Sequence, residues 1–253
     1  MFLKCRFLWA LAMLSVTRLA LAGPPYLTDD PQPTDEGHWE IYNFVNGSHS
    51  QGATNGEAGF DLNYGAAKDV QLTAVLPAAY ANDHGFFSRG LRGGAGVLEL
   101  AVKYKILHQD AQGWMPDVAI FPRVFVPTDS RYGPPRSNLL LPVWAEKDFG
   151  AWSIFGGGGY QINPGDGQRN FWQGGIVVNR QMSDRFSLGA ELFAQTSDVQ
   201  ADDTQSGDAY HAVNFALTYK VTAHGSLLVS AGPTRSETGE HGAVYYLAWY
   251  LQY

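Results

Sequence analysis

Segments of about ten residues recur along this chain, and in each of them apolar and polar residues alternate with a period of two. Such alternation is the pattern of a β-strand whose two faces meet different surroundings. No helical stripe of apolar residues is sustained beyond the first 22 residues, and 29 glycines are hard to place in helices. Twelve segments fit the strand pattern, over approximately 38–47, 55–64, 70–80, 95–107, 114–126, 138–146, 151–162, 170–181, 186–196, 209–219, 226–233 and 243–253.

The connections between these segments alternate in length. The short ones are 66–69, 108–113, 147–150, 182–185 and 220–225. The longer ones, rich in Gly, Asp, Ser or Pro, are 81–94, 127–137, 163–169, 197–208 and 234–242. Outer-membrane barrels have short periplasmic turns and longer extracellular loops. We therefore expect an all-β fold, a transmembrane antiparallel up-and-down β-barrel of about 12 strands, over residues 38–253.

The first 22 residues have the pattern of a cleaved secretory signal peptide. Lys4 and Arg6 precede an apolar run over 7–16, and residues 20–22 form a small-x-small cleavage site. The run is too short to span a membrane as a helix. The only cysteine, Cys5, lies in this segment, so we expect no disulfide and no thiolate metal site after cleavage. Export of this kind predicts a location in the outer membrane of a Gram-negative bacterium.

The last nine residues carry an unbroken bulky apolar face made of Tyr245, Leu247, Trp249, Leu251 and Tyr253. A final strand of this kind resembles the closing strand of an outer-membrane barrel, which the barrel-assembly machinery reads. We therefore expect two partners for the mature protein, outer-membrane lipid and that machinery.

Alternation also assigns the two faces of each strand. A water-soluble sandwich would place the apolar faces inside, but the two ends of the chain favour the inverted arrangement of a membrane barrel. The expected lipid-facing rows are Leu98, Leu100, Val102, Tyr104 and Ile106; Val118, Ile120, Val124 and Val126; and Phe186, Leu188, Ala190 and Leu192. The expected lumen-lining residues are Glu57, Asp61, Asn63, Gln71, Thr73, Glu99, Lys103, Lys105, Asp117, Arg123, Glu191, Gln195, Asn214 and Thr218.

Two ion pairs follow from one choice of register. If the turn after the fourth segment is centred at residues 110–111, Glu99 lies opposite Arg123. The same register places Lys105 opposite Asp117, again on the inward face. Opposite charges across an antiparallel pair contribute about 0.2–1 kcal/mol each. Such pairs fit a charged lining that filters solutes, but they also fit the side-chain filling that any narrow barrel needs, which we favour.

Proline and glycine make one part of the predicted wall unusual. Proline removes a hydrogen-bond donor from a strand, and a run of four glycines removes the side chains from both faces. One interpretation is a loosened wall that forms a lateral exit for apolar solutes, and the favoured alternative is a barrel bent for closure with room for inward loops. The residues of this candidate exit are Pro122, Pro142, Gly156, Gly157, Gly158 and Gly159.

Residues 23–37 precede the first expected strand and are rich in proline and acidic residues. They are expected either to enter the lumen as a plug, with carboxylates against Lys103 or Arg123, or to form a periplasmic lead-in. No ligand spacing typical of a calcium loop is present, so we expect no metal site.

Several motifs of the mature chain form a recognisable set. They are Gly23-Pro24-Pro25-Tyr26-Leu27-Thr28-Asp29-Asp30-Pro31, Gly37-His38-Trp39-Glu40-Ile41-Tyr42, Phe121-Pro122-Arg123-Val124, Val126-Pro127-Thr128, Gly156-Gly157-Gly158-Gly159-Tyr160 and Ile162-Asn163-Pro164-Gly165. This set resembles a family of bacterial outer-membrane proteins known as the phenol-degradation (MetA pathway) or transporter group. The resemblance implies an outer-membrane barrel that passes aromatic or other hydrophobic compounds, and it supplies no catalytic residues.

The functional expectation is therefore a channel or transporter for small hydrophobic or aromatic compounds, not an enzyme. No GxSxG, HExxH or phosphate-loop motif occurs, so no residue is assigned a catalytic, cofactor-binding or metal-binding role. A net charge of −7 without a basic run argues against nucleic acid as a partner. The alternatives are a structural or adhesive barrel without transport and, less favoured, an outer-membrane lipid hydrolase.

Overall fold

In the computed structural model, residues 24–83, 90–111, 113–129, 131–200 and 209–253 are described, and they form fourteen β-strands. No helix in these ranges is long and apolar enough to cross a membrane. The strands are β1 (Trp39–Ser50), β2 (Ala53–Ala67), β3 (Val70–Asn82), β4 (Arg92–Ala95), β5 (Val97–Leu107), β6 (Asp117–Ile120), β7 (Arg123–Pro127), β8 (Asn138–Phe149), β9 (Trp152–Ile162), β10 (Phe171–Ser183), β11 (Phe186–Gln195), β12 (Tyr210–Lys220), β13 (Gly225–Ser236) and β14 (His241–Gln252).

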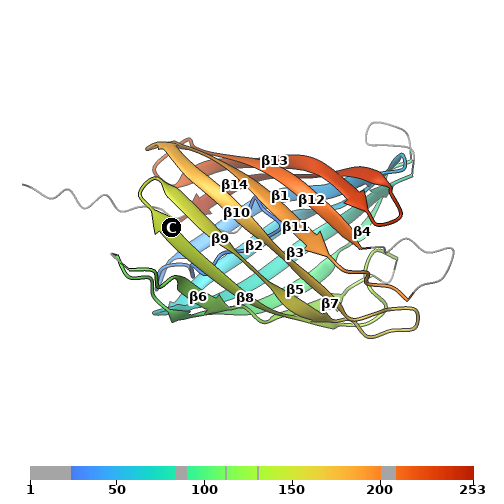
Figure 1. Cartoon of the computed structure of the whole chain (residues 1–253). Helices are drawn as coiled ribbons and strands as arrows, with labels where there is room; N and C mark the ends of the chain where they lie inside the picture. Colours follow the sequence, from blue (N-terminus) through green and yellow to red (C-terminus); the bar gives the residue numbers. More distant parts are fainter. Residues whose placement is uncertain (1–23, 84–89, 112, 130, 201–208) are drawn as a thin grey trace, which may run out of the picture.

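The strands close into one antiparallel barrel because the first and the last of them pair. β1 and β14 stay in register from Glu40↔Gln252 to Ser50↔Gly242. Two of the spanning strands are each divided in two. β4 and β5 both pair with β3, and β6 and β7 both pair with β5 and β8. Counting each divided strand once leaves 14 − 2 = 12 spanning strands (Figure 1), so the predicted fold class is confirmed.

The outer surface of the barrel is apolar, as the alternation predicts. Leu100, Val102 and Tyr104 are 48%, 41% and 46% exposed, whereas Ala101 and Lys103 between them are buried. The other predicted outward rows, on β6, β7 and β11, are likewise exposed or half-buried. Polar and charged side chains are instead buried on the inner face. This arrangement is the reverse of a water-soluble sandwich.

The wall stays in register where proline interrupts it. The break between β6 and β7 falls at Phe121-Pro122, and the pairing with β8 has the same register on both sides of it. Although Pro122 has no N–H, its carbonyl accepts a hydrogen bond from the Val102 N–H at 3.2 Å. The Phe121 N–H donates to the Pro142 carbonyl, also at 3.2 Å. These two hydrogen bonds continue the ladder across the proline break. The lateral exit for apolar solutes stays a prediction.

The glycine run of β9 lies across β8 from this break. Gly156–Gly159 pairs with β8 on one side and with Gly174 and Gly175 of β10 on the other. A Cβ on Gly157, whose φ is +150°, would lie 2.1 Å from the carbonyl oxygen of Val143. Glycine is therefore needed here because the strands approach too closely for a side chain.

The long connections lie at one end of the barrel and the short turns at the other, with exceptions that the sequence did not predict. β1 and β2 meet in a two-residue turn at Gln51-Gly52, whose φ angles are 50° and 81°. Left-handed residues at both positions are typical of tight hairpins. β13 and β14 also extend into the predicted connection 234–242, because the ladder continues to Arg235↔His241. The alternation fades in these polar strand ends, so their boundaries could not be assigned from sequence.

Candidate functional site

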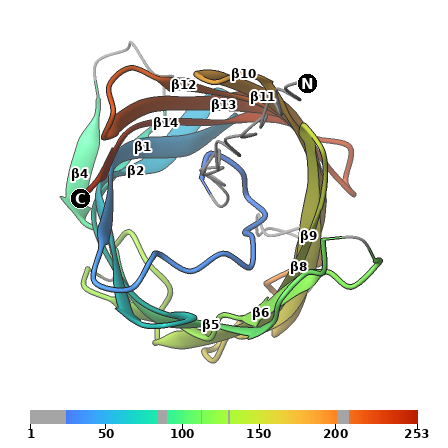
Figure 2. The same cartoon turned by 90° about the vertical axis from the view of Figure 1, so that its left-hand side faces the viewer.

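The barrel encloses a cavity of about 1410 Å³ that reaches toward the end with the long connections. Asp83, Arg92 and Tyr132 line it at that end. At the other end it is bounded by the N-terminal segment, which we define as residues 24–37. Figure 2 shows this segment, in blue, running inside the ring of strands. It is the feature that divides the lumen into a cavity and a filled region.

The first part of the N-terminal segment is held by the wall at β11 to β13. Glu191, which is 1% exposed, accepts hydrogen bonds from the backbone N–H groups of Leu27 at 3.1 Å and Thr28 at 2.6 Å. Asn214 donates to Glu191 and to the Ser230 hydroxyl, both at 3.2 Å. A buried carboxylate that accepts several N–H groups is well satisfied, so Glu191 acts as a fixed anchor.

Two carboxylates of the segment share one lysine. Lys103 Nζ lies 2.9 Å from Asp29 Oδ1 and 3.8 Å from Asp30 Oδ2. Burial alone would raise the pKa of Asp29, but Lys103 and then Arg123 outweigh it and hold this pKa below its usual value. The pKa of Asp30 is raised well above its usual value, chiefly by burial. The segment therefore contributes Asp29, whose charged form is stabilised by an ion pair, and Asp30, whose charged form is disfavoured by burial.

Gln32 fills the lumen on the side of the short turns. Its amide nitrogen donates to Asp117 at 2.8 Å and to Glu146 at 2.7 Å, and its amide oxygen accepts from Lys105. Further along, the Thr34 N–H donates to the Gln71 side chain at 2.8 Å. One amide side chain thus joins three charged residues of the wall.

Inward glycines make room for the segment. A Cβ on Gly175 would lie 2.2 Å from the Thr28 hydroxyl oxygen, and one on Gly189 would lie 1.9 Å from the Tyr26 hydroxyl oxygen. The Tyr26 ring also packs edge-on against Phe155, with centroids 5.6 Å apart. The space that these inward glycines leave is therefore occupied by residues of the same chain.

Both predicted ion pairs form, but the register predicted for them is wrong. Arg123 holds Glu99 with two hydrogen bonds of 2.7 Å each, and Lys105 lies 3.2 Å from Asp117. Arg123 pairs with Ala101 in the ladder, so it reaches Glu99 diagonally. Long side chains span a shift of two residues, and for this reason charge complementarity did not fix the register.

Most of the predicted lumen-lining residues line the cavity, contact the N-terminal segment, or do both. Those that line the cavity are Glu57, Asp61, Asn63, Gln71, Thr73, Glu99, Lys103, Arg123 and Asn214. Lys105 and Asp117 contact the segment from the side of the short turns, and Glu191 contacts it through backbone N–H groups. Thr218 is buried and Gln195 is half-buried, and neither lines the cavity.

One part of the lining was not predicted, an aromatic wall on β1 and β14. Tyr42 and Phe44 are 3% and 8% exposed. Phe44 stacks on Tyr246 with a centroid distance of 6.2 Å, and Tyr42 lies 4.8 Å from Tyr250. The inward aromatic residues of each strand could have been recognised in the sequence. That they form one wall follows only once β1 is paired with β14.

No group of His, Cys, Asp and Glu side chains within the described ranges is arranged to hold a metal ion. The predicted signal peptide, residues 1–22, lies outside the described residues, as does Gly23.

Comparison with known proteins shows similarity of fold. No protein-family model and no curated protein matches the chain. An outer membrane channel from Pseudomonas putida F1 matches with a TM-score of 0.68 at 16% identity, over 88% of this chain and 98% of that one. The NanC porin matches with a TM-score of 0.56 at 11% identity, over 82% and 98%. The translocator domain of the autotransporter NalP from Neisseria meningitidis matches with a TM-score of 0.51 at 10% identity, over 85% and 88%. The chain therefore has the fold of an outer-membrane β-barrel.

Proposed function

We propose that this protein is an outer-membrane channel for the passive passage of small hydrophobic or aromatic compounds. The observation that carries the proposal is the internal cavity of about 1410 Å³, which has aromatic side chains on one wall. Ligand sites commonly combine apolar and aromatic walls with a few placed polar groups. The fold of the solved neighbours and the resemblance to the phenol-degradation group support the same assignment. The proposal includes export by the predicted signal peptide and assembly through the C-terminal strand.

In this proposal the N-terminal segment is a plug. It closes the cavity toward the short turns, so a solute passes only when the segment shifts. It is held by hydrogen bonds and ion pairs of individual side chains, by the packing of Tyr26 on Phe155 and by the backbone bridge Glu36↔Gly65, which is compatible with a movement inside the hydrogen-bonded barrel. A structural or adhesive barrel is the second candidate, but neither role accounts for a cavity of this size. We assign no enzymatic role.

The proposal is tested by solute flux. The mature chain is refolded in detergent, its folding is checked by heat-modifiable mobility, and flux into liposomes is measured for phenol, toluene, a sugar and a small ion. Flux of the aromatic compounds alone is the expected result. Flux of every solute would indicate a general pore, and no flux through a folded barrel would favour the structural role.

A further inference from the structure

The described basic side chains that line the cavity are all paired with carboxylates of the protein itself. Four such residues are found among the lining residues, and each lies within an ion pair. The pairs are Arg92–Asp83, Lys103–Asp29 at 2.9 Å, Arg123–Glu99 at 2.7 Å and Arg131–Asp129 at 2.6 Å.

Four carboxylates that line the same cavity have no such partner. Within the described parts of the chain, no Lys, Arg or His nitrogen lies within 4.0 Å of Glu40, Glu57, Asp61 or Asp198. Two of these carboxylates have uncharged hydrogen-bond partners. Asp61 accepts a hydrogen bond from Asn63 at 2.8 Å, and Glu57 accepts one from a backbone N–H at 3.3 Å. The carboxylates of the cavity that lack a basic partner are therefore concentrated on one wall, since three of these four lie on β1 and β2.

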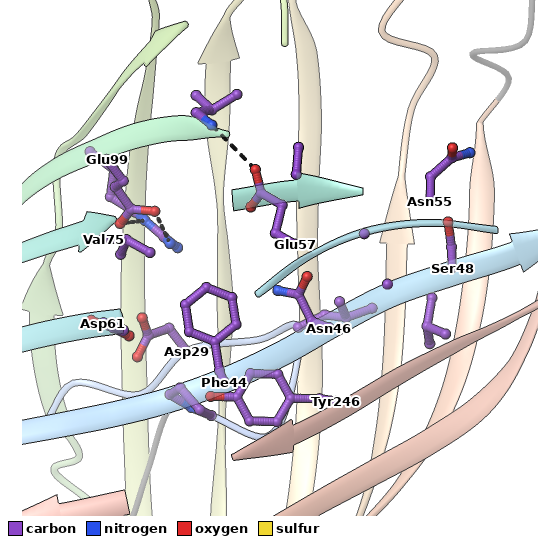
Figure 3. A pocket seen from close by; sticks show the side chains of 18 of the residues that line it. Asp29, Phe44, Asn46, Ser48, Asn55, Glu57, Asp61, Val75, Glu99 and Tyr246 are labelled. Carbon is purple, nitrogen blue, oxygen red and sulfur yellow. Dashed lines mark hydrogen bonds and ion pairs between the residues drawn. The ribbon is translucent and has the colours of Figure 1, made fainter. Parts of the chain in front are cut away.

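These carboxylates lie beside the aromatic wall. In the β1–β2 ladder Tyr42 is opposite Asp61, and Phe44 is opposite Gly59. Glu57 lies two residues before Gly59 along β2, on the same inward face. Phe44 is therefore diagonal to both carboxylates, within reach of a long or aromatic side chain. Gly59 places no side chain between them. Figure 3 shows Asp61, Glu57 and Phe44 facing the same space.

A neighbouring part of the wall, at β5 to β7, combines the same kinds of group and already holds cations of the protein. There, Phe121 has Lys103 Nζ 4.8 Å and the Arg123 guanidinium 5.3 Å from its ring centroid. Each cation is at the same time paired with a carboxylate, Asp29 or Glu99. A cation between a ring and a carboxylate is favoured by both. On the β1–β2 wall the ring and the carboxylates are present, but no described cation of the protein lies over Tyr42, Phe44 or Tyr246.

We propose that the wall formed by Phe44, Tyr42, Asp61 and Glu57 is a binding site for an organic cation, an ammonium group carried on an apolar or aromatic body. The inference rests on the proposed channel function and names a solute class for it. The ammonium lies between Asp61 and Glu57 above Gly59, and the apolar body packs on Phe44 and Tyr246. A bare metal ion fits this wall less well, because hard cations take six or more oxygen ligands and gain little from aromatic rings.

The test compares three probes of one shape. Flux into liposomes and binding to the detergent-solubilised barrel by calorimetry are measured for 2-phenylethylammonium, neutral 2-phenylethanol and anionic phenylacetate. The ammonium compound is expected to bind roughly tenfold more tightly than the alcohol, and phenylacetate most weakly. Tetramethylammonium should compete with it. This competition uses the unchanged protein, so it does not depend on the folding of any variant.

The variants locate the site. Asp61→Asn combined with Glu57→Gln should remove the preference for the ammonium compound and leave the alcohol unaffected, whereas Phe44→Leu should weaken both. Asp198→Asn is the matched control, because it removes an unpaired carboxylate of the same cavity away from the aromatic wall. Equal binding of the three probes would overturn the inference. If the neutral alcohol still crossed, the proposed channel would stand; if no probe crossed but the ammonium compound bound at these residues, the inference would stand and the channel would not.

Discussion

At the scale of single residues, the contacts of Lys103 distinguish two adjacent aspartates. Asp29 makes the close ion pair, whereas Asp30 is fully buried and its second oxygen has no hydrogen-bond partner in the described structure. Asp29→Asn should therefore release the N-terminal segment, because it leaves Lys103 buried with only the distant carboxylate. Asp30→Asn removes a poorly satisfied charge and keeps the acceptor for the Gln32 N–H. Single-channel conductance should rise in the first variant and stay near that of the parent in the second. The reverse order would show that Asp30 is the true anchor.

The same two residues give the position of the segment a defined dependence on pH. The pKa of Asp30 is raised in the docked state, so proton uptake favours docking as the pH falls from neutral. The pKa of Asp29 is lowered, so its stabilisation is present above the usual aspartate pKa of about 3.9 and is lost as the pH falls through its docked value. Conductance should therefore not increase between pH 7 and 5, and should increase only below about pH 4. Opening already at pH 6 would contradict this assignment.

At the scale of strands, one side-chain contact spans four of them, across the β1–β14 pairing that closes the barrel. Tyr80 of β3 and Tyr245 of β14 meet with their hydroxyl oxygens 2.6 Å apart, above Gly47 and Gly56. The Tyr80 hydroxyl also donates to the Asn46 carbonyl at 2.7 Å. Side chains on the two intervening strands would separate the rings, so the glycines are required for this contact.

Removing either hydroxyl group should therefore weaken the closing seam. Tyr80→Phe and Tyr245→Phe should each lower the free energy of unfolding by about 0.5–1.5 kcal/mol, and the double variant should lose less than the sum. Urea unfolding in detergent, followed by heat-modifiable mobility, measures both quantities. Tyr219→Phe, at an exposed tyrosine on the outer surface, is the control. Strictly additive losses would show that the two hydroxyl groups act independently.

The strands also show which features of the fold could be predicted from the sequence and which could not. Period-two alternation placed the outward rows of β5, β6, β7 and β11, because burial inverts at every residue. It could not place the division at Pro122, where the ladder continues without a proline N–H. It could not choose the register of Arg123, since a long side chain reaches a diagonal partner. The aromatic wall was missed because Phe44 and Tyr246 lie at opposite ends of the chain and meet only when the barrel closes.

At the scale of the whole molecule, the protein is a rigid wall with a separate chain segment inside it. The wall is one continuous hydrogen-bonded ring, whereas the N-terminal segment joins it by side-chain contacts and a single bridge, Glu36↔Gly65. The sequence left open whether the segment enters the lumen or forms a periplasmic lead-in, because the residues that hold it, Glu191 and Lys103 among them, come from distant strands. The ring can therefore persist without the segment, and the segment controls the width of the lumen.

Deletion of residues 24–34 tests this division of roles. The barrel should still fold, because the ladder from Trp39 onward is unaffected, and conductance should rise since the contacts of Gln32 and Thr28 are lost. The deletion also removes Asp29 and Asp30, so Lys103 loses its partners and the lumen loses two acidic side chains. Reversal potentials in a salt gradient should consequently show weaker cation selectivity than the Asp29→Asn variant, in which one of these carboxylates remains. If conductance rose while cation selectivity increased, the unpaired carboxylates of β1 and β2, and not the segment, would set the selectivity of the open lumen.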